Sequence, residues 1–191
     1  ALKGMALVAM LAYFMAQGVV WAYLFLIGMA GGLSDQAVAN GLMLSQFAGI
    51  AGALLAAVMA HRFGRSIPLT VGIVGGAMCL YFLVGSFSFV VFALAVGVYN
   101  FFWNLTHPFL LGAMASFDRH GRVVVYAVAM QMVGLAVGPY LAASIISEGV
   151  YINVNWAGAA LFVIAWLLVL PPVLSQARQW QVASLENADV R

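Results

Sequence analysis

The sequence is poor in charge, and its few charged residues avoid the long apolar stretches. Only 6% of the 191 residues are Asp, Glu, Lys or Arg, whereas 66% are hydrophobic. A water-soluble core of this size needs more polar surface, so the composition excludes a soluble globular domain. The basic residues form no cluster that could follow a phosphate backbone, so we predict no nucleic-acid partner.

Cysteine is nearly absent, and histidine and acidic residues are scattered. Cys79 is the only cysteine, so no intrachain disulfide and no cysteine-based metal site can form, and we expect a small buried side chain. His61, His107 and His120 lie far apart in the sequence, and no acid lies within an apolar stretch. Paired catalytic carboxylates and a metal-ligand cluster are therefore not expected. We predict that the protein is not an enzyme and holds no cofactor or metal.

Six long apolar stretches make up most of the chain. Each is long enough to cross the hydrocarbon as a helix, since about 20 residues suffice at a rise of about 1.5 Å per residue. The first is too long for the apolar core of a signal peptide. The predicted spans are 5–30, 37–60, 68–86, 89–116, 123–147 and 150–174. The sequence thus predicts an all-α integral membrane protein whose six-helix bundle covers residues 1–174.

The basic residues predict the orientation of the chain in the membrane. When the six spans alternate in direction, all seven basic residues fall on one side, and the opposite loops contain acids but no Lys or Arg. Because cytoplasmic loops are enriched in Lys and Arg, both termini are predicted to be cytoplasmic in a multi-pass protein of the bacterial inner membrane. Pro171 and Pro172 are expected to end the last span, with 175–191 as a polar tail. The basic residues are Lys3, Arg62, Arg65, Arg119, Arg122, Arg178 and Arg191.

The fourth span carries the densest group of polar residues inside the predicted membrane region. Asn100, Asn104 and His107 follow i, i+4, i+7 spacing and share one helix face, with Trp103 between them. Unpaired amides and an imidazole are costly in hydrocarbon, so this face is predicted to look into the protein or into water. Pro108 removes a backbone hydrogen bond, which bends the helix and leaves a carbonyl near Asn104 free.

A second polar stripe runs along the first span, where Tyr13, Gln17 and Trp21 recur every four residues. Apolar walls with a few convergent polar groups suit an amphipathic small molecule. The alternative for both stripes is hydrogen bonding and packing between helices. Gln46 and Gln131 are solitary polar residues in their spans, and we expect them to bond between helices.

Two loops on the basic side share the pattern Arg-x-Gly-Arg, at 62–65 and 119–122. Glycine permits the tight turn that returns the chain to the membrane. The arginine side chains can bond helix carbonyls, neighbouring acids or lipid phosphates. The need to orient the chain in the membrane would explain the arginines of these loops. It does not explain why both loops contain a glycine at the same position.

The loop at 61–66 is similar to the loop G-x-x-x-D-R-x-G-R-R that joins the second and third helices of a half in the major facilitator superfamily of transporters. Arg62, Gly64 and Arg65 match that pattern. The positions that depart from it are Ala57, His61 and Ser66.

Two further segments have counterparts in the same family. The loop 118–122 is similar to its acidic Arg-Gly-Arg element, and Gly134-x-x-x-Gly138-Pro139 is similar to the glycine-proline motif of its fifth helix. Over all six spans, the chain resembles the C-terminal half of such a transporter. The chain begins with Ala and enters its first span at once, so we expect a segment of a longer protein.

The resemblance implies a secondary transporter that moves a small organic solute by alternating access. It implies two inverted three-helix repeats, at 1–86 and 87–174, and a central cavity lined by the first and fourth helices and completed by an N-terminal six-helix half. The implied substrate-binding residues are Gln17, Trp21, Asn100, Trp103, Asn104 and His107. The implied conformational residues are Arg62, Gly64, Arg65, Pro108, Asp118, Arg119, Arg122, Gly134, Gly138 and Pro139.

Two other interpretations stay open. One is a self-contained six-helix protein that dimerises through its glycine-rich faces as a small transporter or pore. The other is a membrane sensor or assembly subunit that transports nothing. In each case the lipid bilayer is the partner that the composition demands.

Overall fold

Every regular element that the structure describes is an α-helix. The computed structural model describes residues 2–59, 64–118, 120–147 and 149–189, with side chains up to Gln179. The seven helices among them are α1 (Leu2–Trp21), α2 (Leu24–Ala30), α3 (Asp35–Met59), α4 (Ser66–Tyr81), α5 (Phe89–Ala115), α6 (Arg122–Ile145) and α7 (Ile152–Asp189).

Five of these helices, α1, α3, α5, α6 and α7, are long and apolar enough to cross a membrane. The prediction of an all-α integral membrane protein is confirmed at this level. α4 is apolar but has 16 residues, so it is about 24 Å long, shorter than a hydrocarbon core of about 30 Å. The residues after Tyr81, predicted to continue that span, form the turn before α5.

The predicted span 5–30 is two helices, because α1 ends at Trp21 and α2 begins at Leu24. No proline stands at this break. Aromatic residues on both sides of the break contact distant parts of the chain. The rings of Trp21 and Trp103 are 5.4 Å apart, and those of Tyr23 and Tyr151 are 6.3 Å apart. These tertiary contacts lie at a helix break that the local sequence does not predict.

Pro171 and Pro172 do not end the last helix, contrary to the prediction, and α7 continues to Asp189. The dihedral angle φ of proline is compatible with a helix, although each proline removes one backbone hydrogen bond. The packing beyond the prolines holds the helix against α5. Gln176 is buried, and its Nε2 donates to the carbonyl oxygen of Ala113 at 3.1 Å.

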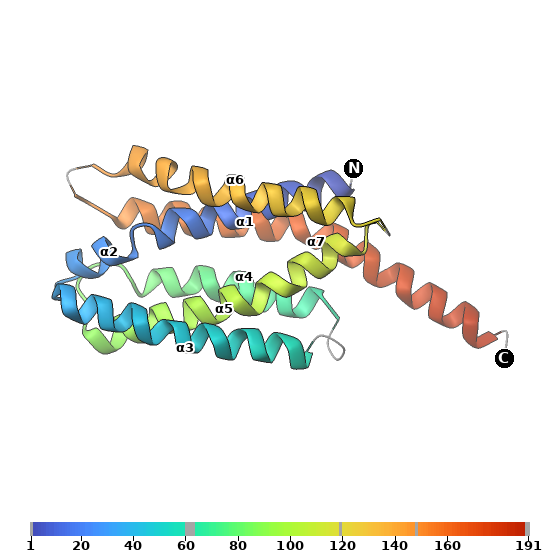
Figure 1. Ribbon diagram of the computed structural model, residues 1–191, viewed down its shortest axis with the longest axis horizontal. Helices are drawn as coiled ribbons and strands as arrows, with labels where there is room; N and C mark the ends of the chain where they lie inside the picture. Colours follow the sequence, from blue (N-terminus) through green and yellow to red (C-terminus); the bar gives the residue numbers. More distant parts are fainter. Residues whose placement is uncertain (1, 60–63, 119, 148, 190–191) are drawn as a thin grey trace.

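The helices pack in two groups (Figure 1). In one group α1 packs against α6 and α7, and in the other α5 packs against α3 and α4. A contact between α4 and α7 joins the groups. α1 and α5 contribute the most buried residues, while Cys79 of α4 is buried as expected. The start of α1, the ends of α3 and α5 and the starts of α4 and α6 lie at one end of the bundle, and α2 lies at the other (Figure 1).

Glycines bring the main chains of paired helices into contact. A Cβ on Gly134 would lie 2.7 Å from the Leu11 carbonyl oxygen of α1, and one on Gly138 would lie 2.7 Å from that of Met15. Gly52 of α3 comes closer still to the main chain of α5, at the carbonyl oxygen of Phe101. The small residues therefore set the spacing of α6 on α1 and of α3 on α5, as close packing in lipid requires.

We expect Gly134→Ala to lower the thermal midpoint of the protein in detergent, because the added methyl group pushes α6 away from α1 at a cost of about 1–3 kcal/mol. Gly76→Ala is the matched control. A Cβ there meets no atom within 4 Å, so the better helix propensity of alanine should leave the midpoint unchanged or raise it. Equal midpoints for the two variants would contradict the close approach of α6 to α1.

Candidate functional site

A cavity of about 320 Å³ lies between α1, α3, α5 and α6. Four of its lining residues come from α5, where helical spacing puts them on one face. The residues that line it are Phe14, Trp21, Gln46, Asn100, Trp103, Asn104, His107, Gln131 and Leu135. A neighbouring hollow along α3 shares Gln46 and Asn104 with it. α4 and α7 contribute no lining residue, so the cavity lies on the opposite side of α1 and α5.

The structure brings together five of the six residues that the sequence singled out for this role: Trp21, Asn100, Trp103, Asn104 and His107. The sixth, Gln17, does not line the cavity. It is 1% exposed, and its Oε1 accepts a hydrogen bond from the hydroxyl group of Tyr99 on α5. Four residues advance a helix by about 40° beyond one turn. Residues four apart on α1 therefore point in different directions, so that Gln17 faces the core and Trp21 faces the cavity.

Gln46 and Gln131 line the cavity, which the sequence argument missed. Gln131 does bond between helices as expected, because its Oε1 lies 3.1 Å from His107 Nε2. Gln46 Nε2 donates only within α3, to the Leu42 carbonyl oxygen at 3.4 Å and more weakly to the hydroxyl of the adjacent serine. Helical spacing could have shown that Gln131 lies near the cavity. Gln131 shares a helix face with Gly134, three residues later, and that face packs on α1.

Hydrogen bonds fix the two asparagines of α5. Asn100 Nδ2 donates to the carbonyl oxygen and the hydroxyl group of Ser45 on α3, at 3.1 and 3.3 Å. Asn104 Nδ2 donates to the carbonyl oxygen of Asn100 at 3.0 Å and to its Oδ1 at 2.9 Å. Asn100 is thus satisfied within the protein, while the Oδ1 of Asn104 has no partner among the described residues.

The bond to Gln131 determines which nitrogen of His107 can accept a hydrogen bond. An amide oxygen only accepts, so His107 Nε2 carries the proton in this bond. In the neutral ring, Nδ1 is then an acceptor. The ring of Phe14 packs edge-on against His107, with centroids 5.1 Å apart, and holds the imidazole in place.

Six polar groups of the wall have no protein partner in the part of the chain that the structure describes. Three are donors: the indole N–H groups of Trp21 and Trp103 and the Nε2 group of Gln131. Three are acceptors: Asn104 Oδ1, His107 Nδ1 and Gln46 Oε1. Among the residues that the structure describes, no Asp, Glu, Lys or Arg lines the cavity. The site can therefore exchange hydrogen bonds with a molecule without balancing a charge.

Two helix prolines leave carbonyl groups next to the cavity without helical partners. Pro108 lies inside α5 and Pro139 inside α6. Because proline has no N–H, the carbonyls four residues earlier, on Asn104 and Leu135, lose their usual donors. Both of those residues line the cavity. Neither proline does so itself.

Arg65 links three helices at the basic end of the bundle. It stands just before α4, and its guanidinium group donates to the hydroxyl of Ser116 at the end of α5 and to Gln176 Oε1 of α7 at 3.4 Å. The glycine that precedes it, Gly64, has φ of +62°, and Gly121 in the other basic loop has φ of +74°. The prediction that glycine forms these turns is confirmed, because other residues rarely adopt such angles.

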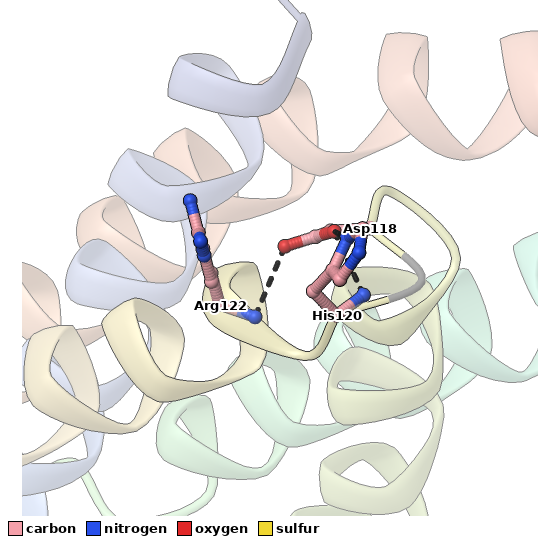
Figure 2. A network of polar contacts seen from close by, with 3 residues as sticks. All are labelled: Asp118, His120 and Arg122. Atoms are coloured by element: carbon pink, nitrogen blue, oxygen red, sulfur yellow. Dashed lines mark hydrogen bonds and ion pairs between the residues drawn. The ribbon is translucent and has the colours of Figure 1, made fainter.

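Asp118 closes its own loop (Figure 2). Its Oδ1 accepts from the backbone N–H of His120 at 2.9 Å, and its Oδ2 accepts from the backbone N–H of Arg122 at 3.0 Å. The Arg122 guanidinium group points away from the carboxylate (Figure 2), so these two side chains do not form the arginine–acid contact considered from the sequence. His120 Nδ1 lies 3.3 Å from Oδ1. Two other predicted conformational residues, Arg62 and Arg119, lie outside the described residues.

A scan of protein-family models finds no match to this sequence, and a search of curated proteins finds none either. The function is therefore inferred from the geometry of the cavity.

The hydrogen bond from the His120 N–H, more than any other contact, lowers the pKa of Asp118 below its ordinary value of 3.8. A lowered pKa means that the loop contact is fully present above pH 3.8 and is lost as the pH falls through the folded-state pKa. We expect the amide proton shifts of His120 and Arg122, followed by NMR, to titrate with a midpoint below 3.8. Asp118→Asn should abolish that titration, and a midpoint above the ordinary value would contradict the assignment.

Proposed function

We propose that this chain is one six-helix half of a transporter of the major facilitator type, which moves a small uncharged organic solute across the bacterial inner membrane by alternating access. One observation carries the proposal: membrane-spanning helices form the wall of an open cavity, and that wall has amides, an imidazole and two indoles with unused hydrogen-bonding groups. Lipid cannot satisfy such groups, so the cavity holds water or a polar solute.

The wall chemistry selects the class of solute. Its three free donors and three free acceptors match a molecule that both donates and accepts, such as one with several hydroxyl or amide groups. A charged solute would enter without a counter-charge, which is expensive inside a membrane. The edge-to-face pair of Trp21 and Trp103, with centroids 5.4 Å apart, adds a flat apolar surface against which a ring can pack.

The pairing of helices supports two inverted three-helix repeats, at 1–86 and 87–174. If α1 and α2 count as one span, each of the first three spans has a counterpart among the last three: α1 with α2 corresponds to α5, α3 to α6, and α4 to α7. Under this correspondence the contact between α3 and α5 matches the contact between α6 and α1. The α4–α5 contact likewise matches α7–α1, and the α2–α3 contact matches α5–α6. All six of these contacts exist. Repeats of this kind place the solute site at their interface, where α1 and α5 contribute to the cavity.

The flanks of the cavity support a partner bundle that covers it. α3 and α6 stand on either side of the cavity, and both expose large apolar residues, such as Phe47 at 66% and Val125 at 68%. We propose that a second six-helix half packs on these two helices and completes the passage, with both termini of this chain in the cytoplasm. Proton coupling would then require an acid from that half, because no Asp or Glu within the described ranges lines the cavity.

The conformational residues act at two places in this proposal. At the cytoplasmic end, Arg65 ties α4 to α5 and α7 and so couples the two three-helix repeats, while Asp118 keeps the α5–α6 connection firm. Within the membrane, Gly134 and Gly138 form a face of α6 that has no side chains. α1 and α6 can slide past each other along this face. Pro108 and Pro139 allow α5 and α6 to bend next to the cavity.

We expect Asn104→Leu and His107→Leu each to lower solute transport at least about tenfold, since each removes a hydrogen bond to the solute worth about 1–3 kcal/mol. The assay is a screen of uncharged, anionic and cationic solutes of similar size with the full-length protein in proteoliposomes. Asn40→Leu is the matched control, because Asn40 is exposed and bonds only to Gln36 of its own helix.

Two results would overturn the proposal. If both cavity variants transported solute at the wild-type rate, the cavity would not be part of the transport pathway. If the protein transported only charged solutes, the proposed solute class would be wrong. Transport by this chain alone, with no second half present, would instead favour a self-contained dimer.

A further inference from the structure

His107 and Gln131 form a hydrogen-bonded pair in the wall of the cavity between α1, α3, α5 and α6. His107 belongs to α5 and Gln131 to α6, and His107 Nε2 lies 3.1 Å from Gln131 Oε1. Both residues line the cavity. Each side chain has one further polar atom, so the pair as a whole offers two groups to a molecule in the cavity.

These two remaining atoms, His107 Nδ1 and Gln131 Nε2, are accessible. Neither has a hydrogen-bond partner among the described residues. In that part of the chain, the unpaired side-chain atoms that are fully enclosed are Thr106 Oγ1 and Asn155 Oδ1. The two atoms of the pair are not among them, so a molecule in the cavity can reach both.

Packing on α1 holds both members of the pair in place. Gly134, three residues after Gln131, lies against the main chain of α1, where an added Cβ would be 2.7 Å from the Leu11 carbonyl oxygen. This contact fixes the distance of α6 from α1 and so the position of Gln131, which is 9% exposed. From α1, the ring of Phe14 packs edge-on against the imidazole of His107, with centroids 5.1 Å apart, and hinders a flip that would exchange its nitrogens.

The hydrogen bond of such a pair can have either of two opposite polarities. In one, His107 Nε2 carries the proton and donates to the amide oxygen, so that Nδ1 is an acceptor and the Gln131 NH₂ group is a free donor. In the other, the amide nitrogen donates to an unprotonated Nε2, and both open groups are reversed. The structure has the first arrangement, with Oε1 of Gln131 toward the imidazole.

We propose that Gln131 is a specificity-determining residue, which fixes the tautomer of His107 so that Nδ1 accepts a hydrogen bond from a hydroxyl or amide N–H group of the solute. The same bond leaves the Gln131 NH₂ group to donate to an oxygen of the solute. A solute with acceptors alone would cover Nδ1 and leave it unpaired, which is unfavourable. This inference rests on the proposed function, because it takes the cavity as the solute site.

The first test is ¹⁵N NMR of labelled histidine in the full-length protein in lipid nanodiscs, without solute and at about pH 8, where imidazole is ordinarily neutral. The ¹⁵N shift of a ring nitrogen shows whether it carries a proton. We expect a protonated Nε2 and an unprotonated Nδ1 for His107, whose signals are those missing from His107→Leu. The result comes from the wild-type protein and does not depend on the folding of a Gln131 variant.

Gln131→Met tests whether the amide is responsible, because it keeps the length of the side chain without the amide. The proton of His107 should then distribute over both ring nitrogens, and their ¹⁵N shifts should move toward each other. Gln46→Met makes the same change on the α3 wall of the cavity. It should leave the His107 shifts as in the wild type, since Gln46 Nε2 bonds only within α3.

The second test compares two ring probes that differ in one hydrogen-bond donor. Cyclohexanol has a hydroxyl group, whereas methoxycyclohexane has a methyl group in place of that proton and only accepts. Cyclohexanol should shift the His107 Nδ1 signal saturably and bind at least about fivefold more tightly, the factor for one hydrogen bond of about 1 kcal/mol. In Gln131→Met, where Nδ1 can carry the proton and donate to the ether oxygen, the preference should fall below about twofold.

Several results would overturn the inference. A protonated Nδ1 in the wild type would mean the opposite polarity or, if Nε2 is protonated as well, a charge in the cavity. Unchanged His107 shifts in Gln131→Met would show that Gln131 does not set the tautomer. Equal binding of the two probes, or no saturable shift of Nδ1 with either, would show that His107 recognises no donor. If both tests succeed but the full-length protein transports no solute, the proposed function alone is wrong.

Discussion

Main-chain contact through glycine is the constraint on which the rest of this bundle depends. Lipid surrounds apolar side chains as readily as a protein core does, so helices in a bilayer associate through close packing and a few hydrogen bonds. Gly134 and Gly138 seat α6 on α1, and Gly52 seats α3 on α5. These two contacts position α3 and α6 as the flanks of a cavity whose back wall is α1 and α5. A side chain at any of the three glycines would move a flank.

The polar residues follow from the same constraint, since each must find a partner away from lipid. Asn100 uses Ser45, Gln17 uses Tyr99, and Gln176 uses Arg65 and the end of α5. These satisfied residues hold helices together. Asn104 and His107 instead keep one polar atom each without a partner in the described part of the chain, and both line the cavity. The difference between satisfied and unsatisfied polar groups separates structural bonds from candidate binding groups at the cavity between α1, α3, α5 and α6.

Several features were predictable because they depend on local chemistry. Apolar length predicts the helices, and i, i+4, i+7 spacing predicts that Asn100, Asn104 and His107 share a face. The repeated glycine of the basic loops predicts turns, which Gly64 and Gly121 form with positive φ. Other features were missed because they depend on contacts distant in the sequence: the break after Trp21, the course of α7 through two prolines and the assignment of Gln17 to the core.

Composition and apolar length are enough to predict an all-α membrane protein, because no arrangement of so few charged residues could cover this apolar surface in water. They also show which residues are unusual in a membrane, since a polar side chain in an apolar span can be recognised without a structure. Which of these residues meet depends on how the helices pack. Helix rotation sends Gln17 into the core and Gln131 to the cavity, and that rotation is set by glycine contacts between helices far apart along the chain.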